Sequence, residues 1–445
     1  MAGRIAFASL GCAKALVDAE QLIARLRALG YELVGDYAEA DLAIVNTCGF
    51  ITPAVEESLE AIGEALKGTG KVVATGCLGA RPEKIAARHP EVLTITGPAE
   101  FDRVIEAVTR VLPPDRDPKT ALVPPPVKLT PRHYAYVKIA EGCNNRCSFC
   151  IIPQLRGPQV SRPAAEVLAE AARLVASGTR ELILIAQDTL AYGRDLRHAE
   201  SDWNGRRVRA HLLDLVEAMA GLGVWVRLQY VYPYPEVEAL VEKMAEGKLL
   251  PYLDVPFQHA SPRILRAMRR PGGFEAYLDR IRAWRRAVPE LALRSNFIVG
   301  FPGETEEDFE LLLDFLKEAE IERVAAFKYS EVEGAAANDL PGRVPEEVKE
   351  ERYHRLMQLQ QEISARVMAR RVGQRLEAIV DAPAEEPGVF VGRTAADSPG
   401  VDGVIYLEGE GLTPGDRVLA EVTGADAYDL FGRVVRTLPW TLPFA

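Results

Sequence analysis

Residues 141–150 read Glu141-Gly142-Cys143-Asn144-Asn145-Arg146-Cys147-Ser148-Phe149-Cys150, which places three of the chain's six cysteines at CxxxCxxC spacing. Thiolate is a soft ligand that selects iron–sulfur clusters, zinc or copper(I). A cubane cluster normally takes four cysteines, yet the other three, Cys12, Cys48 and Cys77, lie far away near the N-terminus. Two sets of three cysteines can hold two clusters, each with one iron open to a ligand from outside the protein. An open coordination position is where a metal can take part in chemistry.

A zinc site and a disulfide framework are the alternatives for this loop. Structural zinc takes four nitrogen or sulfur ligands, but the nearest histidine is His133. Disulfides are typical of exported proteins, and the apolar run before Cys12 is shorter than the ~7–15 residues of the apolar h-region of a signal peptide. No apolar run reaches the ~18 residues that cross a membrane. We therefore expect a cytoplasmic protein with reduced, metal-binding cysteines and no membrane partner.

The N-terminal cysteines occupy equivalent places in a repeating pattern. Strands are predicted at residues 4–9, 41–46 and 71–75, and helices at 15–29 and 52–68. This alternation predicts a parallel sheet with helices on its faces. Cys12, Cys48 and Cys77 each follow a strand, so they are expected to meet at one edge of the sheet. Buried core cysteines are the alternative, which the threefold repetition disfavours.

The fold class expected is α/β, in four segments. Residues 1–112 form the parallel α/β domain, and 113–131, with seven prolines, form an extended linker. Within 132–372, six strand-like runs predict an open, partial (β/α)6 barrel whose active site lies at the C-terminal strand ends. These runs begin near Tyr134, Glu181, Trp225, Tyr252, Leu293 and Arg323, and a long charged helix is expected at 345–371. Residues 373–445 alternate in short runs that predict a small antiparallel β-barrel.

Polar residues and glycines follow several of the barrel strands. Those singled out are Gln187, Gln229, Tyr230, Gln258, His259, Asn296, Gly300 and Gly303. A glycine-containing turn before a helix is weak evidence for nucleotide binding when it stands alone. Capping of strand ends is the alternative for Gln187, Gln258 and Asn296, and a structural role is the alternative for His259.

The motifs resemble those of a known family. CxxxCxxC with Phe149 before the last cysteine resembles the signature of radical S-adenosylmethionine (SAM) enzymes. "SLGCAKALVDAE" and "NTCGFI" around Cys12 and Cys48 resemble the N-terminal motifs of the methylthiotransferase family, and the resemblance covers essentially the whole chain. "AQDTLAYG" (186–193) is more similar to the branch that modifies a ribosomal protein than to the transfer-RNA branch. "GRTAADSPGVDG" (392–403) resembles a TRAM domain. Ala13 replaces a usual proline, and Asn144-Asn145 replaces Asp-His.

The resemblance implies a cofactor set and a reaction. It implies two [4Fe-4S] clusters, one on Cys143, Cys147 and Cys150 and the other on Cys12, Cys48 and Cys77. It also implies SAM, with contacts assigned to Phe149, Gln187, Asn296, Gly300 and Gly303. The implied reaction adds a methylthio group to the β-carbon of an aspartate in ribosomal protein S-twelve (uS12). No general acid or base is assigned, because the C–H step requires none. We also expect a reductant such as flavodoxin or ferredoxin to supply electrons, and we expect the enzyme to be a monomer.

Two other functions stay open from the sequence. One is methylthiolation of a transfer-RNA adenosine, and the other is non-enzymatic electron transfer, which normally uses clusters with four thiolates. Charge bears on the choice between ribosomal protein and transfer RNA as the substrate. The chain has a net charge of −11, and residues 374–445 hold twelve acids against five arginines. An acidic last domain would repel a polyanion and attract a basic protein. A solvated acidic surface without a partner is the alternative.

Overall fold

The computed structural model describes residues 3–116 and 127–441. Residues 117–126 of the predicted linker lie outside this description. The chain forms two compact units. The first, here called the cysteine unit, comprises Met1–Leu129, Glu141–Gln159 and Ser330–Ala335. The second, the barrel unit, comprises Thr130–Ala140, Val160–Tyr329 and Ala336–Ala445.

A five-stranded parallel sheet forms the centre of the cysteine unit. Its strand order is β2 (Glu32–Val34), β1 (Arg4–Ser9), β3 (Leu42–Thr47), β4 (Val72–Gly76) and β5 (Thr94–Ile95). The predicted parallel α/β domain is therefore confirmed. The two edge strands were not predicted, because runs of two or three residues carry too little pattern to be recognised.

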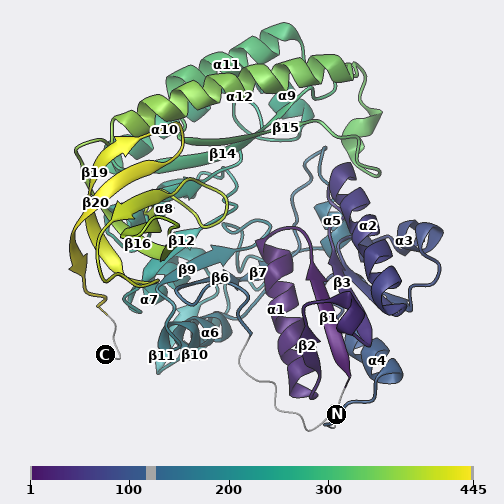
Figure 1. Cartoon of the computed structure of the whole chain (residues 1–445). Coiled ribbons are helices and arrows are strands. Elements are labelled where there is room, and N and C mark those ends of the chain that lie inside the picture. Colours follow the sequence, from purple (N-terminus) through teal and green to yellow (C-terminus); the bar gives the residue numbers. More distant parts are fainter. Residues whose placement is uncertain (1–2, 117–126, 442–445) are drawn as a thin grey trace. The chain divides into compact units, whose positions relative to one another are not determined.

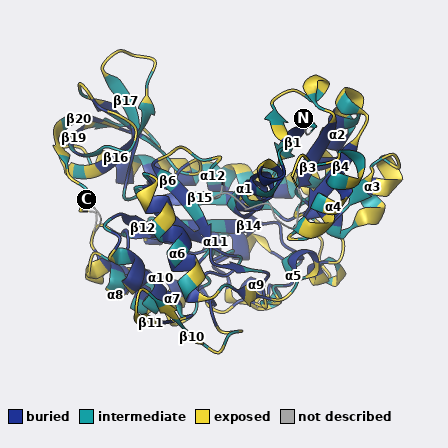
Figure 2. Cartoon of the chain, turned by 90° about the horizontal axis from the view of Figure 1, so that it is seen from below, coloured by how far each residue is buried: buried dark blue, intermediate teal, exposed yellow. Residues whose placement is uncertain are grey.

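Helices cover both faces of this sheet, as Figure 1 shows for α1 and α2. Helices α1 (Ala13–Ala28) and α4 (Phe101–Val111) share an apolar core with Ile5 and Ile44. Helices α2 (Thr52–Thr69) and α3 (Pro82–Arg88) pack on the other face, against Ala43 and Val45 among others. Alternate residues of β3 thus point to opposite faces, and all six of its residues are buried (Figure 2). A strand buried on both sides reads as a continuous apolar run, which is why the sequence revealed it.

The barrel unit contains the six predicted β/α strands. β6 (Tyr134–Lys138), β9 (Glu181–Ile185) and β12 (Trp225–Leu228) form one parallel sheet. β13 (Tyr252–Asp254), β14 (Ala292–Val299) and β15 (Arg323–Lys328) form another. Between the sheets, the backbone N–H of Leu250 donates to Val226 O and that of Val231 donates to Asp254 O, each over 2.9 Å. The partial (β/α)6 barrel is therefore confirmed.

Helices connect these strands and cover their outer side. They are α6 (Ala164–Ala176), α7 (Leu212–Ala220), α8 (Val237–Ala245), α9 (Pro262–Ala267), α10 (Phe274–Ala287), α11 (Glu306–Ala319) and the long α12 (Glu346–Ala369). An antiparallel hairpin, β10 (Glu200–Trp203) with β11 (Arg206–Arg209), adds to the unit and was not predicted. No helix in the described part of the chain is long and apolar enough to cross a membrane.

A closed five-stranded barrel ends the chain. Its strand order is β16 (Arg375–Pro383), β17 (Val389–Thr394), β18 (Ile405–Glu408), β20 (Leu430–Leu438) and β19 (Arg417–Ala425). The pairs are antiparallel, as expected, except that β18 and β20 run parallel. Closure of the barrel pairs the backbone N–H and C=O groups that the edges of an open sheet would leave unpaired.

Buried ion pairs attach this small barrel to the (β/α) barrel. Glu181 accepts hydrogen bonds from Arg227 (2.7 Å) and Arg393 (2.6 Å), and none of the three side chains is more than 2% exposed. Asp397 accepts a 2.5 Å bond from Arg323. Glu181 and Arg323 are the first residues of β9 and β15, so the small barrel contacts the N-terminal ends of the strands. The C-terminal ends, where β/α barrels carry their sites, lie at the opposite edge.

Candidate functional site

Cys12, Cys48 and Cys77 gather at the C-terminal edge of the sheet in the cysteine unit. Cys12 is the N-cap residue of helix α1, three residues after β1, whereas Cys48 and Cys77 directly follow β3 and β4. A Cβ atom added to Gly11 would lie 3.5 Å from Cys48 Sγ. The thiols of Cys12 and Cys48 also both raise the pKa of Cys77, although burial contributes more. The structure therefore brings these three cysteines together.

Local backbone geometry explains how the cysteines approach one another. A Cβ atom at Gly49 would lie 2.8 Å from the backbone nitrogen of Leu78, so only glycine lets the two strand ends pass this closely. Ser58 of helix α2 accepts a hydrogen bond from the Cys48 N–H and donates one to the Cys48 carbonyl oxygen, each at 2.9 Å. These contacts hold the backbone of Cys48 in place.

The second set of cysteines lies on a loop that closes on itself. The N–H of Cys143 donates to Gly157 O over 3.1 Å, and the N–H of Cys150 donates to Cys147 O over the same distance. The short helix α5 (Ile152–Arg156) follows, with Pro153 in its first turn. Its first N–H, from Ile152, points at Cys150 Sγ over 3.5 Å. Backbone donors near a cysteine sulfur favour the thiolate form that a metal requires.

Both sets of cysteines belong to one compact unit. Residues 141–159 group with the N-terminal sheet rather than with the barrel strands that flank them in the chain. Cys77 shares a buried apolar cluster with Ile151 and Leu155 of the loop and with Val332 and Ala335. The order of segments along the chain does not reveal this grouping, because it depends on contacts between distant residues.

Arg156, at the end of α5, touches the N-terminal set directly. Its Nε donates to Cys77 Sγ over 3.2 Å. Its Nη1 donates to Asp18 (3.2 Å) and Glu141 (2.8 Å), and the side chain is 2% exposed. Sequence reasoning did not find Arg156. The one available signal was a charged residue at the end of a short, mostly apolar segment beside the cysteine loop.

The three N-terminal thiols differ in acidity. Burial raises the pKa of Cys48 and of Cys77, and the Arg156 charge only partly opposes this. Cys12 is exposed; partial desolvation acts to raise its pKa, but Lys14, the backbone N–H of Ala15 and Arg156 outweigh this and lower it. Since metal ligands are thiolates, cluster binding at this edge would release protons.

A single metal ion and an iron–sulfur cluster place different demands on three thiolates. In the ranges 3–116 and 127–441, no three His, Cys, Asp or Glu side chains stand close enough to ligate one metal ion. In a cluster, by contrast, each thiolate binds a different iron, so the ligands stand farther apart. Three thiols at one strand edge are donors of the kind that an iron–sulfur cluster takes.

The residues assigned to SAM fall in both units. Phe149 lies on the cysteine loop, whereas Gln187 follows β9, Asn296 lies on β14, and Gly300 and Gly303 follow β14. Within the described residues, Asn296 Oδ1 is buried and has no hydrogen-bond partner. The N–H of Gly300 donates to both carboxylate oxygens of Glu304, each at 3.0 Å, so this donor is already satisfied. The SAM contacts stay predictions.

Two residues with strained backbone lie after the C-terminal ends of strands of the (β/α) barrel. Tyr230, after β12, has φ = 61°, and Gln258, after β13, has φ = 74°. Non-glycine residues in this region cost about 1–3 kcal/mol and cluster at functional sites. The sequence had singled out both residues for their position but could not reveal their strain. His259 is fully buried: its Nδ1 accepts from the Ser261 N–H, and its Nε2 lies 3.3 Å from Glu304 without a hydrogen bond among the described residues. Its structural role stays a prediction.

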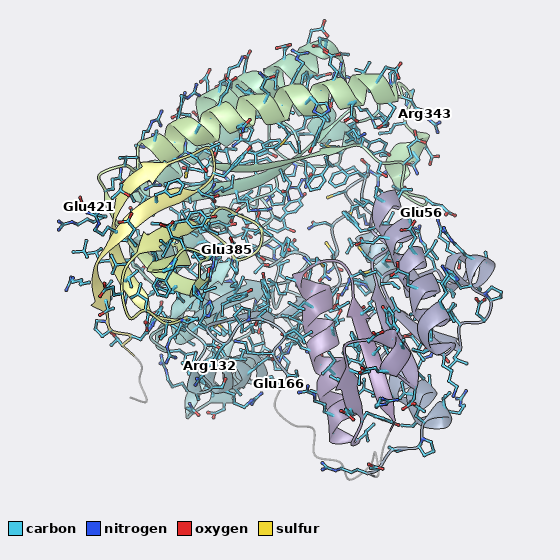
Figure 3. All side chains as sticks on the ribbon, viewed as in Figure 1. Glu56, Arg132, Glu166, Arg343, Glu385 and Glu421 are labelled. Atoms are coloured by element: carbon cyan, nitrogen blue, oxygen red, sulfur yellow. The ribbon has the colours of Figure 1, made fainter. Side chains whose placement is uncertain are left out.

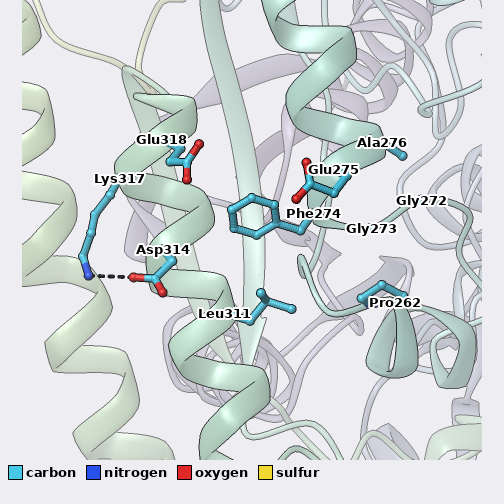
Figure 4. Close-up of a pocket in the computed structure, with 10 residues that line it drawn as sticks. All are labelled: Pro262, Gly272, Gly273, Phe274, Glu275, Ala276, Leu311, Asp314, Lys317 and Glu318. Atoms are coloured by element: carbon cyan, nitrogen blue, oxygen red, sulfur yellow. Dashed lines mark hydrogen bonds and ion pairs between the residues drawn. The ribbon is translucent and has the colours of Figure 1, made fainter.

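A surface pocket of about 780 Å³ lies elsewhere, between α10 and α11 (Figure 4). It is lined by residues that include Phe274, Glu275, Leu311 and the ion-paired Asp314 and Lys317. None of the predicted site residues lines it, so the predicted chemistry does not use it.

Three family models match the chain. They are the Radical SAM superfamily over residues 137–316, the Uncharacterized protein family UPF0004 over 4–97 and the TRAM domain over 372–435. Among solved structures, the chain is similar to the radical SAM methyltransferase TsrM from Kitasatospora setae. That match has a TM-score of 0.53 and 17% identity over 73% of this chain and 72% of TsrM, so it supports the fold alone.

Curated relatives match along almost their full length. A protein of Thermus thermophilus named ribosomal protein uS12 methylthiotransferase RimO is 66% identical over 430 residues, covering 96% of this chain and 99% of the relative. A protein of the same name from Paramagnetospirillum magneticum is 57% identical over 98% of this chain and 97% of the relative. The fold, the two cysteine sets and these matches agree, and the chain belongs to the RimO family of radical SAM methylthiotransferases.

Proposed function

We propose that this enzyme adds a methylthio group to the β-carbon of an aspartate in ribosomal protein uS12, using SAM and two [4Fe-4S] clusters. The observation that carries the proposal is the presence, in one compact unit, of two separate sets of three cysteines. Each set is one thiolate short of the four that saturate a cubane, so a bound cluster would keep one iron open for SAM or for an added sulfur. The relatives named for uS12 support the choice of substrate.

The residues of the chain would hold and shield the cofactors. When bound, the clusters and SAM supply the carbon radical and the sulfur, and this chemistry is the cofactors' own. Cys143, Cys147 and Cys150 would hold one cluster on the self-closing loop. Cys12 and the two strand-end cysteines would hold the other. Enclosure of the reacting atoms keeps water away from a reactive radical.

The surface charge of the C-terminal barrel supports a protein substrate. Three of its twelve acids make contacts that attach it to the (β/α) barrel: Asp381 with His133, Asp397 with Arg323, and Asp402 with Tyr252. The other nine acids are at least partly exposed, as are four of the five arginines, which leaves −5 on this surface. Glu421, labelled in Figure 3, is one of these exposed acids. A basic ribosomal protein would be attracted to this surface, and a transfer RNA repelled.

The remaining assignments follow from this chemistry. A low-potential one-electron donor, such as a flavodoxin or ferredoxin, would supply the reducing electron. The enzyme would work as a monomer in the cytoplasm, where its substrate is made. The electron-carrier alternative is disfavoured, because the curated relatives are enzymes.

Single cysteine variants test the division into two clusters. Replacing Cys147 by Ala should abolish SAM cleavage and remove about half of the iron and sulfide, because the other set keeps its three thiolates. Replacing Cys48 by Ala should also remove about half of the metal but leave 5′-deoxyadenosine formation intact, with no methylthio product. Iron and sulfide assays, together with chromatography of the SAM products, measure these outcomes. Loss of both clusters in either variant would contradict two independent sites.

A further inference from the structure

The guanidinium of Arg156 joins three parts of the cysteine unit that are far apart in sequence. Asp18 comes from helix α1, Cys77 from the end of β4, and Glu141 from the start of the cysteine loop. An arginine buried to this degree is held in place by its partners, because an unpaired charge in a buried position is strongly destabilising. The guanidinium group of an arginine stays protonated in proteins, so the side chain of Arg156 is charged.

Two nitrogens of Arg156 bear on a cluster bound to Cys77. Nε is 3.2 Å from Cys77 Sγ, within range for an N–H···S hydrogen bond. Nη2 is buried and has no hydrogen-bond partner among the residues that the structure describes. A buried donor without a partner is costly unless a ligand satisfies it. Nη2 is thus available to a sulfur atom of a cluster bound to Cys77.

We propose that Arg156 is a positioning residue for the cluster on Cys12, Cys48 and Cys77, and that it raises the reduction potential of that cluster. The proposal rests on the function proposed above, because it requires a cluster at this edge of the sheet. Reduction adds one electron to the cluster, and a nearby positive charge stabilises the added negative charge. Hydrogen bonds to cluster sulfurs and local charge are recognised controls of cluster potentials. Arg156 supplies both, through Nε, Nη2 and its charge.

The Glu141 carboxylate is expected to affect the reduction potential of the cluster in the opposite direction to Arg156. Glu141 lies 2.8 Å from Nη1 and partly offsets the positive charge. Neutralising Glu141 should therefore raise the cluster potential, whereas removing the Arg156 charge should lower it. A general loss of local structure is not expected to shift the cluster potentials of the two variants in opposite directions.

The test uses the full-length chain in which Cys143, Cys147 and Cys150 are all replaced by Ala, so that only the N-terminal cluster can be reconstituted. Its potential is measured by titration with dithionite, followed by electron paramagnetic resonance. Arg156→Met, Arg156→Lys and Glu141→Gln are compared in this background. Arg88→Met is the matched control, because Arg88 lies in the same unit and forms an exposed ion pair with Glu56.

Arg156→Met is expected to lower the potential, Arg156→Lys to lower it less, and Glu141→Gln to raise it. Arg88→Met should leave it unchanged. Equal potentials in all variants at full cluster content would overturn the proposal, as would shifts of Arg156→Met and Glu141→Gln in the same direction. If Arg156→Met does not bind iron, the absence of an upward shift in Glu141→Gln overturns it. If the triple Ala parent binds no iron at all, the two-cluster function fails first, and the role of Arg156 fails with it.

Discussion

At the scale of the residue, Asp308 shows how one carboxylate secures the (β/α) barrel. It accepts hydrogen bonds from Ser261 Oγ (2.6 Å), from the Thr305 N–H (2.9 Å) and from Arg263. Burial acts to raise its pKa, but these donors outweigh burial and lower the pKa to about 2. Since the unfolded value is about 3.9, the stability contributed by Asp308 is present above pH ~4 and is lost as the pH falls towards 2.

Asp308→Asn should therefore lower the free energy of unfolding by roughly 2 kcal/mol at neutral pH and by less near pH 2. Urea unfolding followed by tryptophan fluorescence measures this, because all four tryptophans lie in the barrel unit. Asp314→Asn is the control on the same helix: its ion pair with Lys317 is exposed and should be worth at most about 1 kcal/mol. Equal effects of the two changes at neutral pH would show that the hydrogen bonds of Asp308 do not stabilise the fold.

At the scale of the element, the strand ends of the N-terminal sheet must approach closely to gather three cysteines. Gly49 allows this, because an added Cβ would lie 2.8 Å from Leu78 N and 3.0 Å from Cys77 C. Gly49→Ala should push the ends of β3 and β4 apart and reduce iron and sulfide at the N-terminal set, while SAM cleavage continues. Gly35→Ala is the control, since nothing lies within 4 Å of its added Cβ. Full iron and sulfide content in Gly49→Ala would show that the close approach of β3 and β4 is not needed to gather the three cysteines.

At the scale of the whole molecule, the sequence predicted the elements better than their contacts. The places of Cys12, Cys48 and Cys77 after their strands follow from local patterns, and so do the starts of the six barrel strands. The contacts of Arg156 depend on residues up to 138 positions away, which periodicity cannot reveal. The acids of the last barrel read as uniform surface charge, yet Asp397 is buried against Arg323. Burial of a charge depends on the partner that the fold brings to it.

The buried ion pairs of Glu181 are expected to hold the C-terminal barrel on the (β/α) barrel. Glu181→Gln would leave Arg227 and Arg393 buried without their shared carboxylate, at a cost of about 3–5 kcal/mol. Hydrogen exchange should then show faster opening of β16 and β17. Glu377→Gln, which breaks only the partly exposed pair with Arg417, should cost at most about 1 kcal/mol. Unchanged exchange in Glu181→Gln would mean that the buried ion pairs do not hold the two barrels together.

A substrate assay would show whether this methylthiotransferase acts on ribosomal protein uS12. Reconstituted enzyme, SAM, sulfide and a reductant would be incubated with recombinant uS12 or with an unmodified transfer RNA, and both products analysed by mass spectrometry. We predict a methylthio mass gain on one aspartate of uS12 and none on the RNA. A gain on an adenosine of the RNA, with uS12 unmodified, would contradict the proposed substrate and the role given to the acidic barrel.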